Sequence, residues 1–206
     1  MNDFSPPHPE RFAAAIARFD AENARDPRKT TDAGAAQPLE VAYSRWLTGW
    51  VLRLRPDASE ALRLAARSQH LCRWEIPRES YPATRAGYLQ WRQKLKAFHA
   101  DKAAEILRAV GYDQETVQRV HDLNLKRHFP EDAEARTLED ALCLLFLERQ
   151  FAELAQKTTR EKMIGALQKC WAKMTPAARS LAGTIMYGPL ERQLLTDALA
   201  SPDAAG

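Results

Sequence analysis

The sequence has no long apolar run and only three cysteines. No stretch approaches about 18 apolar residues, so we expect no transmembrane helix. The first residues, MNDFSPPHPERF, show no basic segment followed by an apolar one, which argues against a signal peptide. The cysteines, Cys72, Cys143 and Cys170, are odd in number, widely spaced and free of any CxxC pair. They indicate buried, reduced thiols in a cytoplasmic protein rather than a cysteine zinc site.

Common motifs for nucleotide and ester chemistry are absent as well. The sequence contains no P-loop, GxGxxG, GxSxG or HExxH motif, so P-loop nucleotide hydrolysis and serine hydrolysis have no support. The net charge of +3 is too small to imply a general affinity for nucleic acids. The 206 residues suffice for a real core without covalent staples. Function must therefore be sought in local groups of side chains.

Apolar residues recur at helical spacing, and no segment alternates as a strand does. The pattern predicts an all-α protein, a bundle of about eight helices in a single domain over residues 1–206. This domain would have a core at about 9–173, a helical appendage at 174–200 and a loop at 23–37 that is either surface or a cover for a ligand. The longer helices are expected at about 9–22, 38–54, 58–73, 84–109, 114–127, 138–156 and 159–173.

Positive charge is concentrated in one part of the chain. Between Arg63 and Lys96 there are six arginines and two lysines, opposed only by Glu75 and Glu79. The rest of the chain is slightly acidic. Arginine binds phosphate or carboxylate through two parallel hydrogen bonds and stacks on aromatic rings. Aromatic residues lie between these arginines, so the segment suits an anionic ligand that carries a ring.

Helical spacing brings a histidine into line with arginine on two successive predicted helices. On the helix expected at 58–73, His70 shares a line with Arg67, and on the next helix His99 shares a line with Arg92. If the two helices pack antiparallel, the lines converge. The alternative is that arginine stems merely cover apolar surface while their charged ends stay in water. Two such lines, joined by a proline-rich loop that also contains arginine, favour a ligand site.

The candidate roles follow from these residue types. His70 and His99 are the acid–base candidates, because histidine titrates near neutral pH. The predicted ligand-binding residues are the arginines and aromatics of the same segment: Arg67, Arg73, Trp74, Arg78, Tyr81, Arg85, Tyr88, Trp91 and Arg92.

Two further groups have alternative interpretations. Asp140 lies on the apolar line of its predicted helix, where a metal, an arginine or a histidine would have to pair with it. Alternatively, Asp140 completes a helix cap with Thr137. The dipeptide His121-Asp122 looks like a metal motif, but adjacent residues face different sides of a helix, which favours a solvated surface.

Two long strings resemble a known family. The segment from EVAYSRW to LKAFHA, with its core QHLCRWEIPR, and the later LEDALCLLFLERQF resemble the family called domain of unknown function 4202. The resemblance runs from about residue 9 to about residue 197. It identifies a family without implying a reaction.

A weaker similarity is to the all-helical HD phosphohydrolases. LAARSQHLCR is similar to the helix that carries their His-Asp pair, and LEDALCLLFLE is similar to the helix that carries their last aspartate. The resemblance implies His70 at or beside the pair and Asp140 as the last aspartate. Leu71 follows His70, however, and Tyr43-Ser44-Arg45 stands where the first histidine is expected. An intact metal set is therefore missing, although His70, His99 and Asp140 could still supply three ligands.

The preferred hypothesis is an HD-like helical protein that binds a phosphorylated or nucleotide-like anion in an arginine- and aromatic-rich pocket. Residual hydrolase activity is left open, and the cofactor, if the protein uses one, is left unknown. One alternative is an interaction module that docks an acidic protein or RNA through its cationic face. The other is a phosphohydrolase that depends on a divalent metal.

Overall fold

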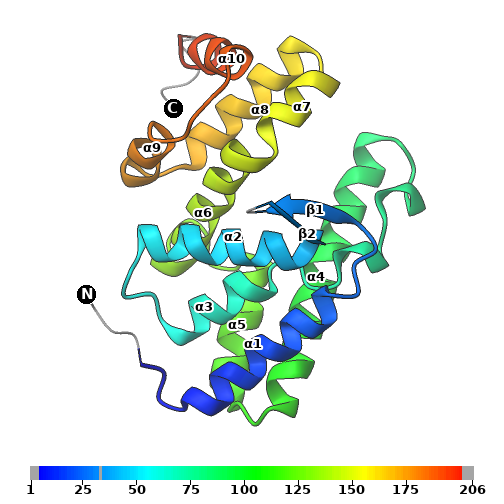
Figure 1. Cartoon of the computed structure of the whole chain (residues 1–206), viewed down its shortest axis with the longest axis vertical. Coiled ribbons are helices and arrows are strands. Elements are labelled where there is room, and N and C mark those ends of the chain that lie inside the picture. The colour runs from blue at the N-terminus through cyan, green and yellow to red at the C-terminus, as the bar shows by residue number, and fades with distance from the viewer. Residues whose placement is uncertain (1–4, 33, 201–206) are drawn as a thin grey trace. The chain divides into compact units, whose positions relative to one another are not determined.

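The computed structural model describes residues 5–32 and 34–200. The chain divides into two compact units, Met1–Ala135 and Arg136–Gly206, and each is described by itself. Helices dominate both units, which confirms the all-α class (Figure 1). The boundaries expected for a single domain with a separate appendage stay a prediction. Within the described residues no helix has the length and apolar character needed to cross a membrane.

The first unit is built from five α-helices: α1 (Pro9–Asn23), α2 (Leu39–Leu54), α3 (Glu60–Ser68), α4 (Arg85–Ala109) and α5 (Gln114–Leu125). Short polar residues begin three of them, because Ser59, Thr84 and Asp113 each accept a hydrogen bond from a backbone N–H three residues further on. Gly111 takes a φ of +86° between α4 and α5, a conformation that glycine adopts without strain. α5 packs against both α3 and α4 (Figure 1).

A hairpin occupies part of the segment that was expected to be loop. Strand β1 (Lys29–Asp32) pairs antiparallel with β2 (Ala35–Pro38), and the hairpin packs beside α2 (Figure 1). The strands are short and have no buried face, so the sequence shows no apolar alternation that could have indicated them.

The helix expected at 58–73 is shorter than predicted. α3 ends at Ser68, and two 3₁₀ turns follow, η1 (Arg73–Glu75) and η2 (Arg78–Ser80). Cys72 has a φ of +55°, which turns the chain sharply before η1. His70 therefore lies in a turn. The helical line of His70 with Arg67 that we expected from the sequence does not form.

The second unit contains most of α6 (Ala133–Arg149), followed by α7 (Phe151–Lys157), α8 (Arg160–Lys173), α9 (Pro176–Ala182) and α10 (Pro189–Ala200). The helix predicted at 138–156 is thus two helices with a break at Gln150. Thr137 lies inside α6, so the predicted cap of Asp140 with Thr137 is wrong. Asp140 instead accepts hydrogen bonds from the backbone N–H (2.9 Å) and the hydroxyl (2.6 Å) of Thr175, the residue that caps α9.

Candidate anion-binding site

Five side chains from three segments of the first unit form a group that we call the histidine cluster. α2 supplies Glu40 and Tyr43, the chain after α3 supplies His70 and Arg73, and α4 supplies His99. Glu40 and His99 are each only 2% exposed, whereas the His70 side chain is 19% exposed. The cluster therefore reaches from the protein interior to the surface at His70.

The two histidines predicted from the sequence lie beside each other. Their ring centroids are 5.8 Å apart. Tyr43 stacks on His70, with centroids 4.0 Å apart and an angle of 16° between the rings. The rings therefore converge as expected, although His70 arrives from a turn.

One hydrogen bond fixes the tautomer of His99. Its Nδ1 lies 2.7 Å from the carbonyl oxygen of Leu71. A carbonyl can only accept, so Nδ1 carries the hydrogen and the neutral ring has a bare lone pair at Nε2. Burial, and next the neighbouring His70, lower the pKa of His99 to about 3, so the ring is neutral at pH 7. Nε2 is buried and has no hydrogen-bond partner among the described residues.

Glu40 presents a second buried acceptor. Its Oε1 accepts a hydrogen bond from Arg28 at 2.6 Å, and two further hydrogen bonds to the carboxylate of Asp26, each 3.0 Å long, orient the same guanidinium. Oε2 of Glu40 has no hydrogen-bond partner within the described chain and lies 3.5 Å from Nδ1 of His70. Burial raises the pKa of Glu40, while the charges of Arg28 and Arg73 oppose that shift.

The surroundings of His70 are positively charged. Its pKa is well below the usual value because the ring is buried and because Arg73, Lys126, Arg28 and Arg92 repel a proton there, in that order of importance. The guanidinium of Arg73 stacks on Trp91 at 4.9 Å from the ring centroid. It forms no ion pair with any carboxylate in the described part of the chain. Arg73 is thus a cation beside the histidines that retains its capacity to bind an anion.

The family described as Domain of unknown function (DUF4202) matches residues 13–195. The chain belongs to this family. The match covers the whole histidine cluster and most of both units, which confirms the resemblance drawn from the sequence. No curated protein and no solved structure matches the DUF4202 chain. The similarity to HD phosphohydrolases stays a prediction.

Other predicted ligand-binding residues of the DUF4202 chain have structural partners. Arg67 forms two hydrogen bonds to the carboxylate of Asp20 on α1, at 2.8 and 2.6 Å. Arg78 donates to the carbonyl oxygens of Tyr81 (2.9 Å) and Pro82 (2.8 Å) and so holds the loop before α4. These two guanidinium groups are engaged within the protein, in contrast to that of Arg73.

The remaining predicted residues lie at or near the surface. Arg85, Tyr88 and Arg92 are exposed on the first turns of α4, and Trp74 and Tyr81 are half-buried. Trp91 is buried and donates its indole N–H to the carbonyl oxygen of Ile76 at 2.9 Å. His121 bonds to Asp101 at 3.1 Å on a partly exposed helix face, which agrees with its expected surface position.

Sequence reasoning missed Glu40 and Arg28. The available signal was a single acidic residue, Glu40, in an otherwise apolar helix start, LEVAY, that follows a proline. A fully buried carboxylate needs partners, but the sequence does not say which cation, among 30 lysines and arginines, would pair with it.

A surface hollow of about 770 Å³, lined by residues of α5 and its neighbours such as Gln114 and Arg119, contains none of the predicted site residues.

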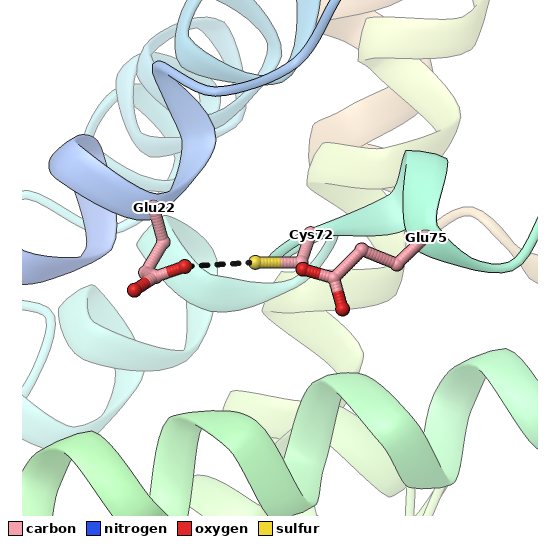
Figure 2. Close-up of side chains that lie close together, drawn as sticks. All are labelled: Glu22, Cys72 and Glu75. Atoms are coloured by element: carbon pink, nitrogen blue, oxygen red, sulfur yellow. Dashed lines mark hydrogen bonds between the residues drawn. The ribbon is translucent and has the colours of Figure 1, made fainter.

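The same segment also contributes to a second polar group, which we call the cysteine cluster: Glu22, Cys72, Glu75 and Lys102. Figure 2 shows Glu22 and Glu75 on either side of Cys72, whose thiol donates to Glu22 at 3.6 Å. Among the described residues, Glu22, Cys72 and Glu75 form the group whose potential metal-binding atoms all lie within 4.8 Å of one another. Lys102 Nζ lies 3.8 Å from Glu22 and 3.7 Å from Glu75, so an internal ammonium takes the cation position. Burial raises the pKa of Cys72 to about 12, which keeps the thiol protonated.

Proposed function

We propose that the protein binds a small anionic molecule, phosphorylated or nucleotide-like, at the histidine cluster. The observation that carries this proposal is the position of Arg73, which forms no ion pair among the described residues, close to the neutral rings of His70 and His99. A cation at a partly buried position is costly unless a negative charge compensates it. An anion held near Arg73 would supply that charge.

The residues of the cluster have distinct roles in this proposal. Arg73, whose guanidinium carbon lies 4.9 Å from the centroid of the Trp91 ring, would form two parallel hydrogen bonds to the anion, and the exposed Arg92 would add a second positive charge. His70, the more exposed histidine, would take a proton from a water molecule that attacks a bound phosphoryl group, while the departing oxygen takes a proton from solvent, and this would complete a hydrolysis. His99 would accept a hydrogen bond at Nε2.

A second candidate function has its own observation. At the start of α4 the exposed Arg85, Tyr88 and Arg92 lie near Leu89, which is 55% exposed. A basic surface with exposed aromatic and apolar side chains suits an interaction module for RNA or an acidic protein. Binding there would not need the histidines.

The proposal also includes a reducing, cytoplasmic location. Cys72, Cys143 and Cys170 are all free, and the first two are buried. Unpaired thiols are typical of proteins that work in reducing compartments.

A thermal-shift screen tests the first function. The protein would be unfolded with inorganic phosphate, sugar phosphates, nucleotides and a short RNA, with sodium chloride matching the ionic strength. We expect a phosphorylated small molecule to raise the Tm, because a ligand that binds only the native state stabilises it. Arg73→Met should abolish the increase, whereas Arg108→Met, at the exposed far end of α4, should preserve it.

The possible results separate the two functions. A Tm increase that survives both Arg73→Met and His70→Gln would contradict the proposed site. An increase with RNA alone, lost in Arg92→Met but not in His70→Gln, would favour the interaction module.

A further inference from the structure

The histidine cluster contains two acceptors that the protein leaves unsatisfied. His99 Nε2 and Glu40 Oε2 are buried and have no hydrogen-bond partner among the described residues. Both side chains are 2% exposed, so bulk water does not reach them freely. A buried acceptor without a donor is costly, and such atoms are rare in native proteins. A ligand that binds here must therefore supply hydrogen-bond donors to these two acceptors.

The hydrogen bond from Nδ1 of His99 to the Leu71 carbonyl determines that Nε2 of His99 acts only as an acceptor. Because the Leu71 carbonyl holds the hydrogen on Nδ1, Nε2 cannot donate to an anion. An oxyanion whose oxygens are all deprotonated would place a lone pair against the lone pair of Nε2. An oxyanion that still carries an O–H would donate to Nε2 while its charged oxygens face Arg73.

We infer that the ligand of the histidine cluster is an oxyanion that carries its own O–H, such as hydrogen phosphate. His99 recognises this O–H by accepting a hydrogen bond from it at Nε2. The inference rests on the proposed function and narrows its ligand class. Fully deprotonated oxyanions of the same shape, of which sulfate is the simplest, are rejected.

Inorganic phosphate and sulfate make a matched pair of probes. They have the same tetrahedral shape, but at pH 7 phosphate retains at least one O–H and sulfate retains none. Isothermal titration of the wild-type chain with each sodium salt, at equal ionic strength, should show phosphate binding at least about tenfold more tightly. Leaving one hydrogen-bonding group unpaired in a buried site has an effect of this order.

A variant of His99 tests whether this residue causes the preference for phosphate over sulfate. His99→Gln keeps a polar side chain, but its amide can turn either its oxygen or its NH₂ group toward the anion. The preference for phosphate over sulfate should therefore fall to less than about threefold, because the amide serves both anions. Arg108→Met should leave the wild-type preference unchanged. The Tm of each variant shows whether it is folded.

The outcomes distinguish this inference from the function on which it rests. Equal binding of the two anions by the wild-type chain would overturn the inference and leave the proposed function standing; a buried water on Nε2 would explain that result. A preference that persists in His99→Gln would also overturn it. If neither anion binds, the inference fails, and the proposed function is decided by the thermal-shift screen with sugar phosphates and nucleotides.

Discussion

The histidine cluster and the cysteine cluster flank the same turn of the chain, between His70 and Glu75, yet they differ in how they are paired. In the cysteine cluster, Lys102 lies between Glu22 and Glu75, and Arg25 adds a second cation 2.9 Å from Glu22. In the histidine cluster, two buried acceptors have no donor and Arg73 forms no ion pair, as far as the described residues go. A group of charges that satisfies itself needs no ligand, whereas an incomplete group indicates what would complete it.

The largest expected effect comes from the residue that joins the two clusters. Asn23 is buried; it accepts the backbone N–H of Cys72 at 3.1 Å and donates to the backbone oxygen of Glu40 at 3.4 Å. Asn23→Ala leaves the buried N–H of Cys72 without a partner and removes the side-chain donor from the Glu40 carbonyl, so the free energy of unfolding in urea should fall by about 3 kcal/mol. The exposed Gln90→Ala is the control and should change it by less than about 0.5 kcal/mol. Equal effects of the two changes would show that Asn23 does not connect the clusters.

The pH dependence of stability should report the histidine cluster. Burial and nearby cations lower the pKa of His70 and His99 in the folded state, that of His99 to about 3. Below the ordinary histidine pKa these histidines are protonated in the unfolded chain but stay neutral in the folded chain. The free energy of unfolding is therefore highest above about pH 6.5 and falls as the pH is lowered toward 3. Each histidine should contribute a slope of about 1.4 kcal/mol per pH unit in that window.

Urea unfolding between pH 7 and pH 4 measures this slope. His99→Gln should reduce the slope by one proton, and the double change His70→Gln with His99→Gln should reduce it by two. A slope that is the same in wild type and double variant would mean that neither ring is buried as the structure shows.

A smaller effect is expected in the cysteine cluster. Lys102→Met removes the ammonium between Glu22 and Glu75 and leaves two carboxylates beside a protonated thiol. Because these side chains are a quarter to a third exposed, the loss should be only about 1 kcal/mol in urea unfolding. Adding Glu75→Gln should recover most of it, since Arg25 still balances Glu22. A double variant no more stable than Lys102→Met would contradict the electrostatic explanation.

The smallest stability effect is expected from His99→Leu. The change loses the hydrogen bond to Leu71, but it also removes the unsatisfied Nε2, so the two contributions largely offset each other. The free energy of unfolding at pH 7 should change by less than about 1 kcal/mol, while phosphate binding, measured by titration, should be lost. A loss of several kcal/mol would indicate that His99 is a structural residue.

The contrast between the clusters also shows what the sequence could predict. Helical periodicity predicted most helices, which in the structure begin at caps such as Asp113 and Thr175, and the density of arginine and histidine directed attention to the region of the candidate site. The partners could not be predicted, because Arg67 with Asp20 and His99 with Leu71 are contacts between segments far apart in the chain. The same tertiary contacts decide which arginines are engaged and which, like Arg73, are not.

The local errors have physical causes as well. α3 ends early because the chain after it turns at Cys72, which has a positive φ and donates its N–H to Asn23. Helix propensity does not predict such a tertiary contact. Asp140 faces inward as expected, but it pairs with Thr175 rather than Thr137, 35 positions away in the chain instead of three.

The most direct test of the central claim is a nitrogen–proton NMR spectrum of the histidine rings, recorded at pH 7 with and without sodium phosphate. The account predicts that His99 is neutral with its hydrogen on Nδ1, and that phosphate shifts its Nε2 resonance as that atom accepts a hydrogen bond. A hydrogen on Nε2 of His99, or resonances of His70 and His99 that do not respond to phosphate, would contradict the claim that the histidine cluster is an incomplete anion site.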